Sequence, residues 1–396
     1  MAYAPRVMSP LTVLHLSQPV DGGVARVVTD LARAQSADGI RAVVACPPGG
    51  ELSRTAAAAG AEVVPWPAGR DPGPRLPGEV ARAARLIGRL GPDVVHTHSA
   101  KAGLAGRLAA RGRVPTVHQP HAWSFEAADG PVGALALCWE RYATRWSGRV
   151  VCVSEDERRR GREAGVRARW EVIRNGVDLE RFPSTGTQEA AAVRARARAV
   201  LPALDRLPPD TPLVVCVGRL CVQKGQDLLL RAWREVAARV PGARLALVGD
   251  GPERRALGRV APDGVLFAGP VGDPVPWYQA ADLVVLPSRW EGMALVPLEA
   301  MACGRTVVST DIGGARESMP PDPHPATLVP PGDAESLAAA LTVLLTNPRL
   351  RDALGRQAEE HVRTTYDVRR TAAAVAAVYR DLLGLPQPEH RECTRR

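Results

Sequence analysis

A chain of 396 residues is too long for one compact core, and it suits two domains of ordinary size. With 45% hydrophobic residues the composition is globular, and no apolar run approaches the roughly eighteen residues that a membrane span needs. The net charge of +9 comes with arginine instead of lysine nearly everywhere, so it indicates a compositional bias rather than a nucleic-acid-binding surface.

The first half of the chain alternates strand patterns with helix patterns. Short apolar runs predict five strands, and helical spacing predicts three helices between them. The strands are expected at residues 11–20, 40–47, 62–67, 93–98 and 114–119, and the helices at 24–39, 78–91 and 99–112. Buried strands that alternate with amphipathic helices predict βαβ units and a parallel sheet with helices on both faces.

The second half repeats this plan after a Pro- and Ala-rich stretch that starts near residue 183. Strand, glycine turn, helix and strand follow one another over residues 212–251. We therefore predict two doubly wound domains, residues 1–182 and residues 183–366. Residues 386–396 lack an apolar pattern and are predicted to form a disordered tail.

The loop after the first strand of the second half, 218-GRLCVQKG-225, carries two cations. Gly218 follows the strand directly, and Arg219 and Lys224 precede the next helix. A guanidinium fork and a compact ammonium at one strand end can hold a diphosphate, and a solvated basic loop is the alternative. Lys101 and Lys224 are the only lysines of the chain, which favours the diphosphate site.

Polar residues also follow the strands of the first half. Gly22 and Gly23 open a helix after the first strand and allow a ligand close to the backbone, although a tight turn explains them equally well. Four of the eight histidines cluster at two neighbouring strand ends: His96, His98, His118 and His121. His96 and His98 share one strand face, and no third metal ligand with supporting spacing is visible. The cluster predicts a polar pocket rather than a metal site.

Two carboxylates, Glu291 and Glu299, stand eight apart in the apolar segment 291-EGMALVPLE-299. The preceding strand is predicted at 283–287, and Pro297 favours the first turn of a helix, which would place Glu299 in that turn. Glu299 could simply complement the helix dipole, whereas a carboxylate pair that binds sugar or ribose hydroxyls explains both residues.

Taken together, these segments resemble the retaining GT-B glycosyltransferases of family 4. The resemblance covers roughly residues 11–380 and depends on a set of motifs in a fixed order. They are the early DGG loop, VCVSEDE at 151–157, VIRNGVDLERF at 172–182, VGRLCVQKGQD at 217–227, LVGDGPE at 247–253, ADLVVLPS at 281–288, EGMALVPLEAMACG at 291–304 and STDIGGARE at 309–317.

The resemblance implies two Rossmann-like domains that face each other across a cleft, with a helix over residues 367–385 that crosses back to the N-terminal domain. It implies that Arg219 and Lys224, with Gly218, bind the donor diphosphate. It further implies that Glu299 binds the ribose and that Glu291 binds the transferred sugar. The backbone N–H groups that assist are those of Met293, Ala294 and Leu295.

In the N-terminal domain the resemblance implies that His121 is the active-site histidine, with His118 as the alternative assignment. Gly22, Gly23, His96, His98 and His118 would line the sugar and acceptor cleft. The implied reaction is retaining transfer from a nucleoside-diphosphate sugar, with UDP favoured over GDP. No D-x-D motif occurs, so neither a metal nor a cofactor is expected.

The sequence leaves the acceptor open. Exopolysaccharide or lipid-linked glycan synthesis is the favoured interpretation, and a soluble natural-product aglycone is an alternative. An epimerase or hydrolase on the same fold is a second alternative. Seven singly placed cysteines predict buried free thiols and a cytoplasmic location. Residues 139–149 carry tryptophan and arginine and suggest a peripheral membrane contact, although an ordinary half-buried helix is the simpler interpretation.

Overall fold

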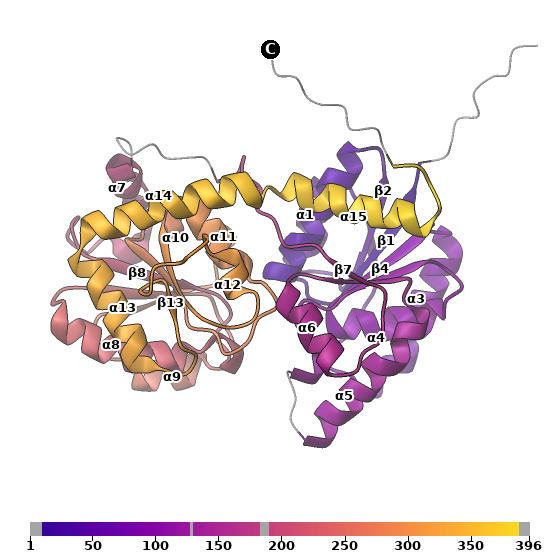
Figure 1. Cartoon of the computed structure of the whole chain (residues 1–396), viewed down its shortest axis with the longest axis horizontal. Coiled ribbons are helices and arrows are strands. Elements are labelled where there is room, and N and C mark those ends of the chain that lie inside the picture. The colour runs from indigo at the N-terminus through magenta and orange to yellow at the C-terminus, as the bar shows by residue number, and fades with distance from the viewer. Residues whose placement is uncertain (1–9, 127–129, 183–189, 388–396) are drawn as a thin grey trace, which may run out of the picture. The chain divides into compact units, whose positions relative to one another are not determined.

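A computed structural model describes residues 10–126, 130–182 and 190–387. The chain forms two compact units (Figure 1). The first comprises Met1–Val153, Arg158–Ile173 and Arg369–Arg396, and the second comprises Ser154–Glu157 and Arg174–Val368. The boundary between the units thus falls at residues 173–174, whereas the sequence predicted it at residues 182–183. Residues 388–396, most of the predicted tail, lie outside the described residues.

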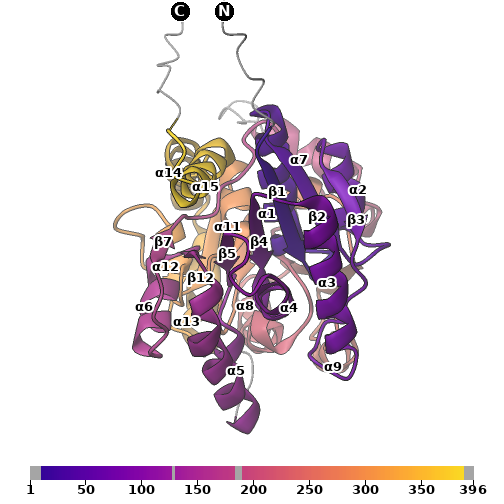
Figure 2. The same ribbon diagram turned by 90° about the vertical axis from the view of Figure 1, so that its right-hand side faces the viewer.

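The first unit is built on a parallel sheet of seven strands in the order β3-β2-β1-β4-β5-β6-β7 (Figure 2). β1 pairs with both β2 and β4, so β2 and β3 extend the sheet on one side of β1 and the later strands extend it on the other. The strands are β1 (Thr12–Ser17), β2 (Arg41–Cys46), β3 (Glu62–Pro65), β4 (Val94–His98), β5 (Thr116–Gln119), β6 (Arg149–Cys152) and β7 (Trp170–Val172).

Helices cover this sheet, and apolar side chains of both layers form the cores around Leu14, Val95 and Ala105 and around Val28 and Val44. The helices are α1 (Gly23–Ala37), α2 (Glu51–Ala58), α3 (Leu76–Leu90), α4 (Ser99–Ala110), α5 (Gly130–Ala143), α6 (Glu155–Glu163), whose first turn belongs to the second unit, and α15 (Val368–Leu382). Although α15 comes last in the chain, it lies beside α1 of the first unit (Figure 1), where Gln35 donates a hydrogen bond to the Tyr379 hydroxyl.

The second unit contains a six-stranded parallel sheet in the order β10-β9-β8-β11-β12-β13. Its strands are β8 (Leu213–Val217), β9 (Arg244–Val248), β10 (Val265–Gly269), β11 (Leu283–Leu286), β12 (Thr306–Thr310) and β13 (Leu328–Val329). Its helices are α7 (Ala190–Ala199), α8 (Gln226–Arg239), α9 (Arg254–Val260), α10 (Val275–Ala280), α11 (Leu295–Ala302), α12 (Ala315–Ser318), α13 (Ala334–Thr346) and α14 (Pro348–Thr365). The predicted α/β class with two doubly wound sheets is confirmed.

Two sequence expectations about burial can be compared with the structure. Within the described part of the chain, no helix is both long and apolar enough to cross a membrane. Cys46, Cys152, Cys216, Cys221 and Cys303 are free and buried, whereas Cys138 is exposed. The expectation of buried thiols is therefore wrong for Cys138, because it lies on the outer face of α5 rather than in a strand.

Lys101 has a structural partner. Its ammonium, on α4, lies 2.7 Å from the Glu79 carboxylate of α3, and the two side chains are only 4% and 2% exposed. The ammonium also donates to the carbonyl oxygen of Asp71 at 2.9 Å, and Glu79 accepts from the backbone N–H of Gly69 at 2.8 Å. This buried pair ties α3 and the loop before it to α4.

We expect Lys101→Met to destabilise the first unit by about 3–5 kcal/mol, because it leaves a buried carboxylate without its counter-charge. Arg41→Met is the matched control, since the Arg41–Glu62 pair is 44% exposed on both sides and should contribute at most about 1 kcal/mol. Hydrogen exchange of the backbone amides of β1 and β4 measures the loss of stability in each variant. Equal losses in the two variants would contradict a special role for the buried pair.

Candidate active site

The two cations of the second unit lie in the loop between β8 and α8. Arg219 is exposed, and its carbonyl oxygen accepts a hydrogen bond from the Gln226 side chain at 3.0 Å. Lys224 ends a 3₁₀ turn, and Gly225 follows it with φ +65°. A Cβ on Gly225 would lie 2.0 Å from the carbonyl oxygen of Pro287. Only glycine permits this approach, so the loop packs directly on the end of β11.

Lys224 contacts one of the two predicted carboxylates. Its ammonium donates to Glu291 Oε1 at 2.5 Å, and the Ser288 hydroxyl donates to the same oxygen at 2.8 Å. Glu291 is buried. Helix α11 has Ala294 at its N-cap, and this residue makes no side-chain cap. The structure therefore joins the basic loop and the carboxylate loop in one cluster of charges.

Glu299 is held separately. Helix α11 starts at Leu295, so Glu299 lies in its second turn, and the predicted first-turn position is wrong. The reason is that the chain becomes helical right after Ala294, two residues before Pro297. The buried Glu299 carboxylate accepts a hydrogen bond from the Tyr278 hydroxyl of α10 at 2.7 Å. The backbone N–H groups of Met293, Ala294 and Leu295 lie where α11 begins, and a helix has no acceptor of its own for its first N–H groups.

The loop between the two glutamates is fixed through its carbonyl oxygens. Gly292 accepts from the Ser154 hydroxyl at 3.0 Å and from the N–H of Gly314 at 2.9 Å. The Asn175 side chain donates to the carbonyl oxygen of Met293 at 2.7 Å. A Cβ on Gly314 would lie 2.2 Å from the Gly292 oxygen, so this close approach again requires glycine. Three distant segments thus hold one short loop.

Glu317, on the short helix α12, holds those same segments together. Its carboxylate accepts from the backbone N–H groups of Glu155 and Asp156 at 3.1 and 3.0 Å, and from Arg174 Nε at 3.0 Å. Sequence reasoning did not single out Ser154, Asn175 or Glu317, although each stands in a quoted motif. A signal was present for Ser154, which follows the apolar run of residues 150–153 directly, whereas Asn175 and Glu317 stand further from a strand.

In the first unit, His96 and His98 lie on one face of β4, as predicted, with ring centroids 4.0 Å apart. His15 of β1 joins them, with Nδ1 3.0 Å from His98 Nε2. His98 Nδ1 in turn lies 3.2 Å from His121 Nε2. The first three rings are completely buried, and His121 is half-buried. Sequence reasoning missed His15, whose signal was a polar residue inside an apolar strand.

The structure does not bring His118 to this face. Its Nδ1 lies 3.0 Å from the Thr97 hydroxyl, and Thr97 points away from the side that His96 and His98 share. A Cβ on Gly103 of α4 would meet the His118 ring at 2.3 Å. His118 is therefore a buried residue between β5 and α4, next to the ion pair of Arg107 and Glu140.

The backbone at His121 is unusual. His121 and Ala122 both have positive φ angles, +55° and +88°. Side chains other than glycine rarely adopt this conformation, and pairs of such residues tend to mark functional sites. The turn after β5 thereby carries the His121 ring back toward His98.

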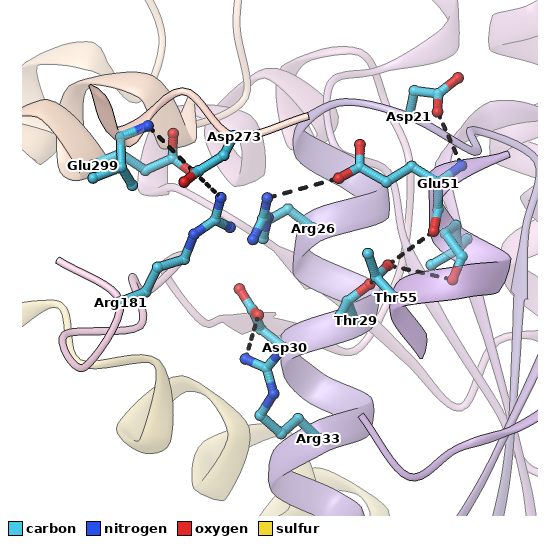
Figure 3. A network of polar contacts seen from close by, with 12 residues as sticks. Asp21, Arg26, Thr29, Asp30, Arg33, Glu51, Thr55, Arg181, Asp273 and Glu299 are labelled. Carbon is cyan, nitrogen blue, oxygen red and sulfur yellow. Dashed lines mark hydrogen bonds and ion pairs between the residues drawn. The ribbon is translucent and has the colours of Figure 1, made fainter. Parts of the chain in front are cut away.

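Gly22 and Gly23 lie exposed where α1 begins, and Gly22 has φ +78°. A Cβ at either position would meet nothing within 4 Å, so the space beside this backbone is open. Neighbouring contacts brace the segment (Figure 3): Arg26 pairs with Glu51 at 4.0 Å, and Asp21 accepts from the Glu51 N–H at 3.1 Å. The turn at Gly22 is thus fixed while its surface stays accessible.

Burial keeps the histidine cluster uncharged. It lowers the pKa of His15 to about 4 and holds the pKa values of His96 and His98 well below the ordinary value, where neighbouring imidazoles act in the same direction. Burial also lowers the pKa of His121. Among the described residues, His15, His96 and His98 have nitrogen atoms within 4.8 Å of one another, an arrangement that could hold a metal ion. However, two of these rings already hydrogen-bond to each other.

Comparisons with known proteins agree with this layout. Residues 21–181 match the profile of "Glycosyltransferase Family 4", and residues 211–347 match that of "Glycosyl transferases group 1". The D-inositol 3-phosphate glycosyltransferase of Thermomonospora curvata is 33% identical over 301 residues, which cover 69% of this chain and 68% of that protein. The chain belongs to glycosyltransferase family 4.

Other family 4 relatives include the lipopolysaccharide core biosynthesis mannosyltransferase LpcC of Rhizobium leguminosarum, 34% identical over 225 residues, which cover 54% of this chain and 60% of LpcC. Among solved structures, Anabaena Alr3699/HepE in complex with UDP-glucose superposes with a TM-score of 0.79 at 23% identity, over 94% of this chain and all of HepE. The enzyme is thus a glycosyltransferase of the GT-B fold that uses a nucleotide-sugar donor.

Acid should destabilise the first unit of this glycosyltransferase. Unfolded histidines bind protons below pH 6.5, whereas buried His15 resists protonation until about pH 4, so stability is lost as the pH falls between these values. The titration of His15 alone should lower the free energy of unfolding of the first unit by about 2 kcal/mol between pH 7 and pH 5.

Hydrogen exchange of β1 and β4 across this range, corrected for the intrinsic rate, measures the loss. His15→Gln should flatten the slope, and His324→Gln in the second unit is the control. A flat profile in the wild type above pH 5 would contradict the neutral, buried cluster.

Proposed function

We propose that this family 4 enzyme transfers a sugar, with retention, from a UDP-sugar to a hydroxyl group of an exopolysaccharide or lipid-linked glycan acceptor. The cluster of Lys224, Glu291 and Ser288 at the start of α11 is the main observation behind it. It combines a cation for the diphosphate with a buried carboxylate for sugar hydroxyls. Family membership supports the same chemistry.

The donor diphosphate would be bound by cations and backbone donors. Arg219 offers an exposed guanidinium in the β8–α8 loop, and Lys224 offers an ammonium on the same loop. The N–H groups of Met293, Ala294 and Leu295 add the positive end of the α11 dipole. Negative charge grows on the diphosphate as the glycosidic bond breaks, and fixed donors of this kind stabilise it in the transition state without a metal ion.

The two glutamates would divide the hydroxyl groups of the donor. Glu299 would accept from the ribose hydroxyls, with its second oxygen fixed by the Tyr278 hydroxyl. Glu291 would accept from a hydroxyl of the transferred sugar while Lys224 and Ser288 hold Oε1. His121 would hydrogen-bond a sugar and not attack it. Retention then follows from front-face attack by the acceptor through an oxocarbenium-like transition state.

UDP is the proposed nucleotide of the donor. The support is the structure of HepE with UDP-glucose, whose fold this chain shares at 23% identity. GDP is the next candidate.

A surface on α5 supports an acceptor at a membrane. Val132, Leu135 and Tyr142 are 66%, 72% and 45% exposed, and their spacing places them along one side of the helix. Arg145 stacks over the Tyr142 ring at 3.7 Å, so cationic and apolar groups lie together. Such a stripe suits the interface of an anionic bilayer, where a lipid-linked acceptor would be held.

A phosphorylated polyol is the second candidate acceptor. D-inositol 3-phosphate glycosyltransferases from several organisms match this chain at 33% identity over about 70% of their length. A soluble aglycone, or donor epimerisation or hydrolysis without any acceptor, are further outcomes that a product assay would separate. Turnover with each acceptor class, followed by release of UDP, decides among them.

We expect UDP to raise the unfolding midpoint more than GDP, ADP or dTDP, and equally with magnesium or with chelator. At a hundred times its dissociation constant, UDP should add about 2.7 kcal/mol of stability. Arg219→Met should raise the dissociation constant about 10- to 100-fold, because a charged hydrogen bond to phosphate is lost.

Arg289→Met is the matched control, since Arg289 lies near the same loop but pairs with Asp227 at 2.7 and 2.8 Å. Thermal-shift titration measures all three proteins. The donor assignment fails when no nucleotide shifts the midpoint, or when both variants lose UDP binding to the same extent.

We expect the enzyme to bind phosphatidylglycerol vesicles, more weakly at high salt, and Leu135→Asp to abolish this binding because it puts a charge in the middle of the α5 stripe. Val343→Asp is the control, since Val343 is another exposed aliphatic residue, 45% exposed on α13 of the second unit. Cosedimentation measures both. Absence of salt-sensitive binding together with good turnover of a soluble aglycone would contradict the membrane-linked acceptor.

A further inference from the structure

A continuous row of hydrogen bonds connects α15 to His121 within the first unit. The Tyr379 hydroxyl accepts from Gln35 Nε2 at 3.4 Å, and Gln35 Oε1 lies 2.8 Å from His15 Nε2. His15 Nδ1 then lies 3.0 Å from His98 Nε2, and His98 Nδ1 lies 3.2 Å from His121 Nε2. Apart from His121, which is half-buried, every member of the row is fully buried.

The direction of each bond follows from its neighbour. A carbonyl oxygen can only accept, so Gln35 Oε1 requires the proton of His15 on Nε2. A neutral imidazole carries one N–H, which leaves His15 Nδ1 as an acceptor and requires the proton of His98 on Nε2. The same step makes His98 Nδ1 an acceptor and requires the proton of His121 on Nε2.

These bond directions require neutral rings, and burial provides them. The pKa values of His15, His98 and His121 all lie below the ordinary value for histidine. The row also requires the amide orientation of the structure, in which Gln35 Nε2 faces the Tyr379 hydroxyl and Oε1 faces His15. Gln35 Nε2 donates to the Tyr379 hydroxyl, which can donate its own proton to His96 Nδ1 at 2.6 Å. An inverted Gln35 amide would reverse every proton in the row.

We propose that Gln35, His15 and His98 are positioning residues that fix the tautomer of His121, with the proton on Nε2 and a free electron pair on Nδ1. His121 then meets a sugar as a hydrogen-bond acceptor. This inference rests on the proposed function only for what His121 binds, because the tautomer is a property of the protein alone.

A metal ion held by His15, His96 and His98 is the competing use of the same residues. It would require the facing nitrogens of His15 and His98 to bind the ion instead of each other. The 3.0 Å hydrogen bond between them favours the row of protons.

Nitrogen NMR of the full chain with ¹⁵N-labelled histidine tests the proposal without any substrate. The His121 resonances are assigned by their loss in His121→Asn. We expect a protonated, pyrrole-type Nε2 and a bare, pyridine-type Nδ1 in the wild type at pH 7.5. The opposite pattern in the wild type would overturn the proposal outright, whether or not the enzyme transfers sugar.

Gln35→Met keeps the shape of the side chain and removes the oxygen that starts the row. Because the effect passes through the rings of His15 and His98, this variant should show both tautomers of His121. It should also lower kcat about 10-fold with little change in the KM for the donor. Thr97→Val is the matched control, because Thr97 hydrogen-bonds His118 outside the row. It should alter only the His118 resonances.

Three results would refute the row. They are an unchanged His121 tautomer in Gln35→Met, an equal change in Thr97→Val, and stoichiometric zinc binding that shifts the resonances of His15, His96 and His98 together. A change of tautomer without loss of activity would count against the proposed function of the site and leave the row intact. If Gln35→Met does not fold, the wild-type spectrum and the zinc titration still decide.

Discussion

The second unit depends on the fixed backbone of residues 291–294. The carbonyl oxygens of Gly292 and Met293, which a solvent-exposed loop would leave to water, accept hydrogen bonds from Ser154, Asn175 and Gly314 instead. Because the N–H of a trans peptide points opposite to its C=O, the N–H groups of Met293 and Ala294 face away from these donors. A diphosphate bound at the start of α11 would find donors already oriented, so little ordering would oppose binding.

In the first unit, side chains instead of backbone groups fix the orientation of a site residue. The backbone of His121 has a positive φ angle, and its ring lies in hydrogen-bond distance of His98. His98 is in turn held by His15. Each ring is neutral because burial makes the charged form costly, and neutrality is what gives each bond a defined direction. In both units, residues from distant parts of the sequence fix a group that would otherwise have several orientations.

Sequence reasoning predicted the fold class, the strands that carry the site and the candidate residues on loops, because strand–helix alternation and glycine turns are local signals. It placed His96 and His98 on one face from period two alone. It could not find Gln35 or Tyr379 as partners of the histidines, since hydrogen bonds between α1, β1 and α15 depend on packing. It misplaced Glu299 by a turn, because α11 already begins at Leu295, two residues before Pro297.

The two lysines show how composition and geometry combine. In a chain that uses arginine almost everywhere, both lysines donate to a buried carboxylate. Lys101 and Glu79 are enclosed on all sides, which suits a compact ammonium and leaves no room for a ligand. Lys224 is 18% exposed beside Glu291, so its ammonium has donors left for a second anion. A lysine–glutamate pair thus stabilises packing in the first unit, whereas in the second unit the lysine of such a pair stays available to a diphosphate. The two pairs differ in the access of solvent to the ammonium.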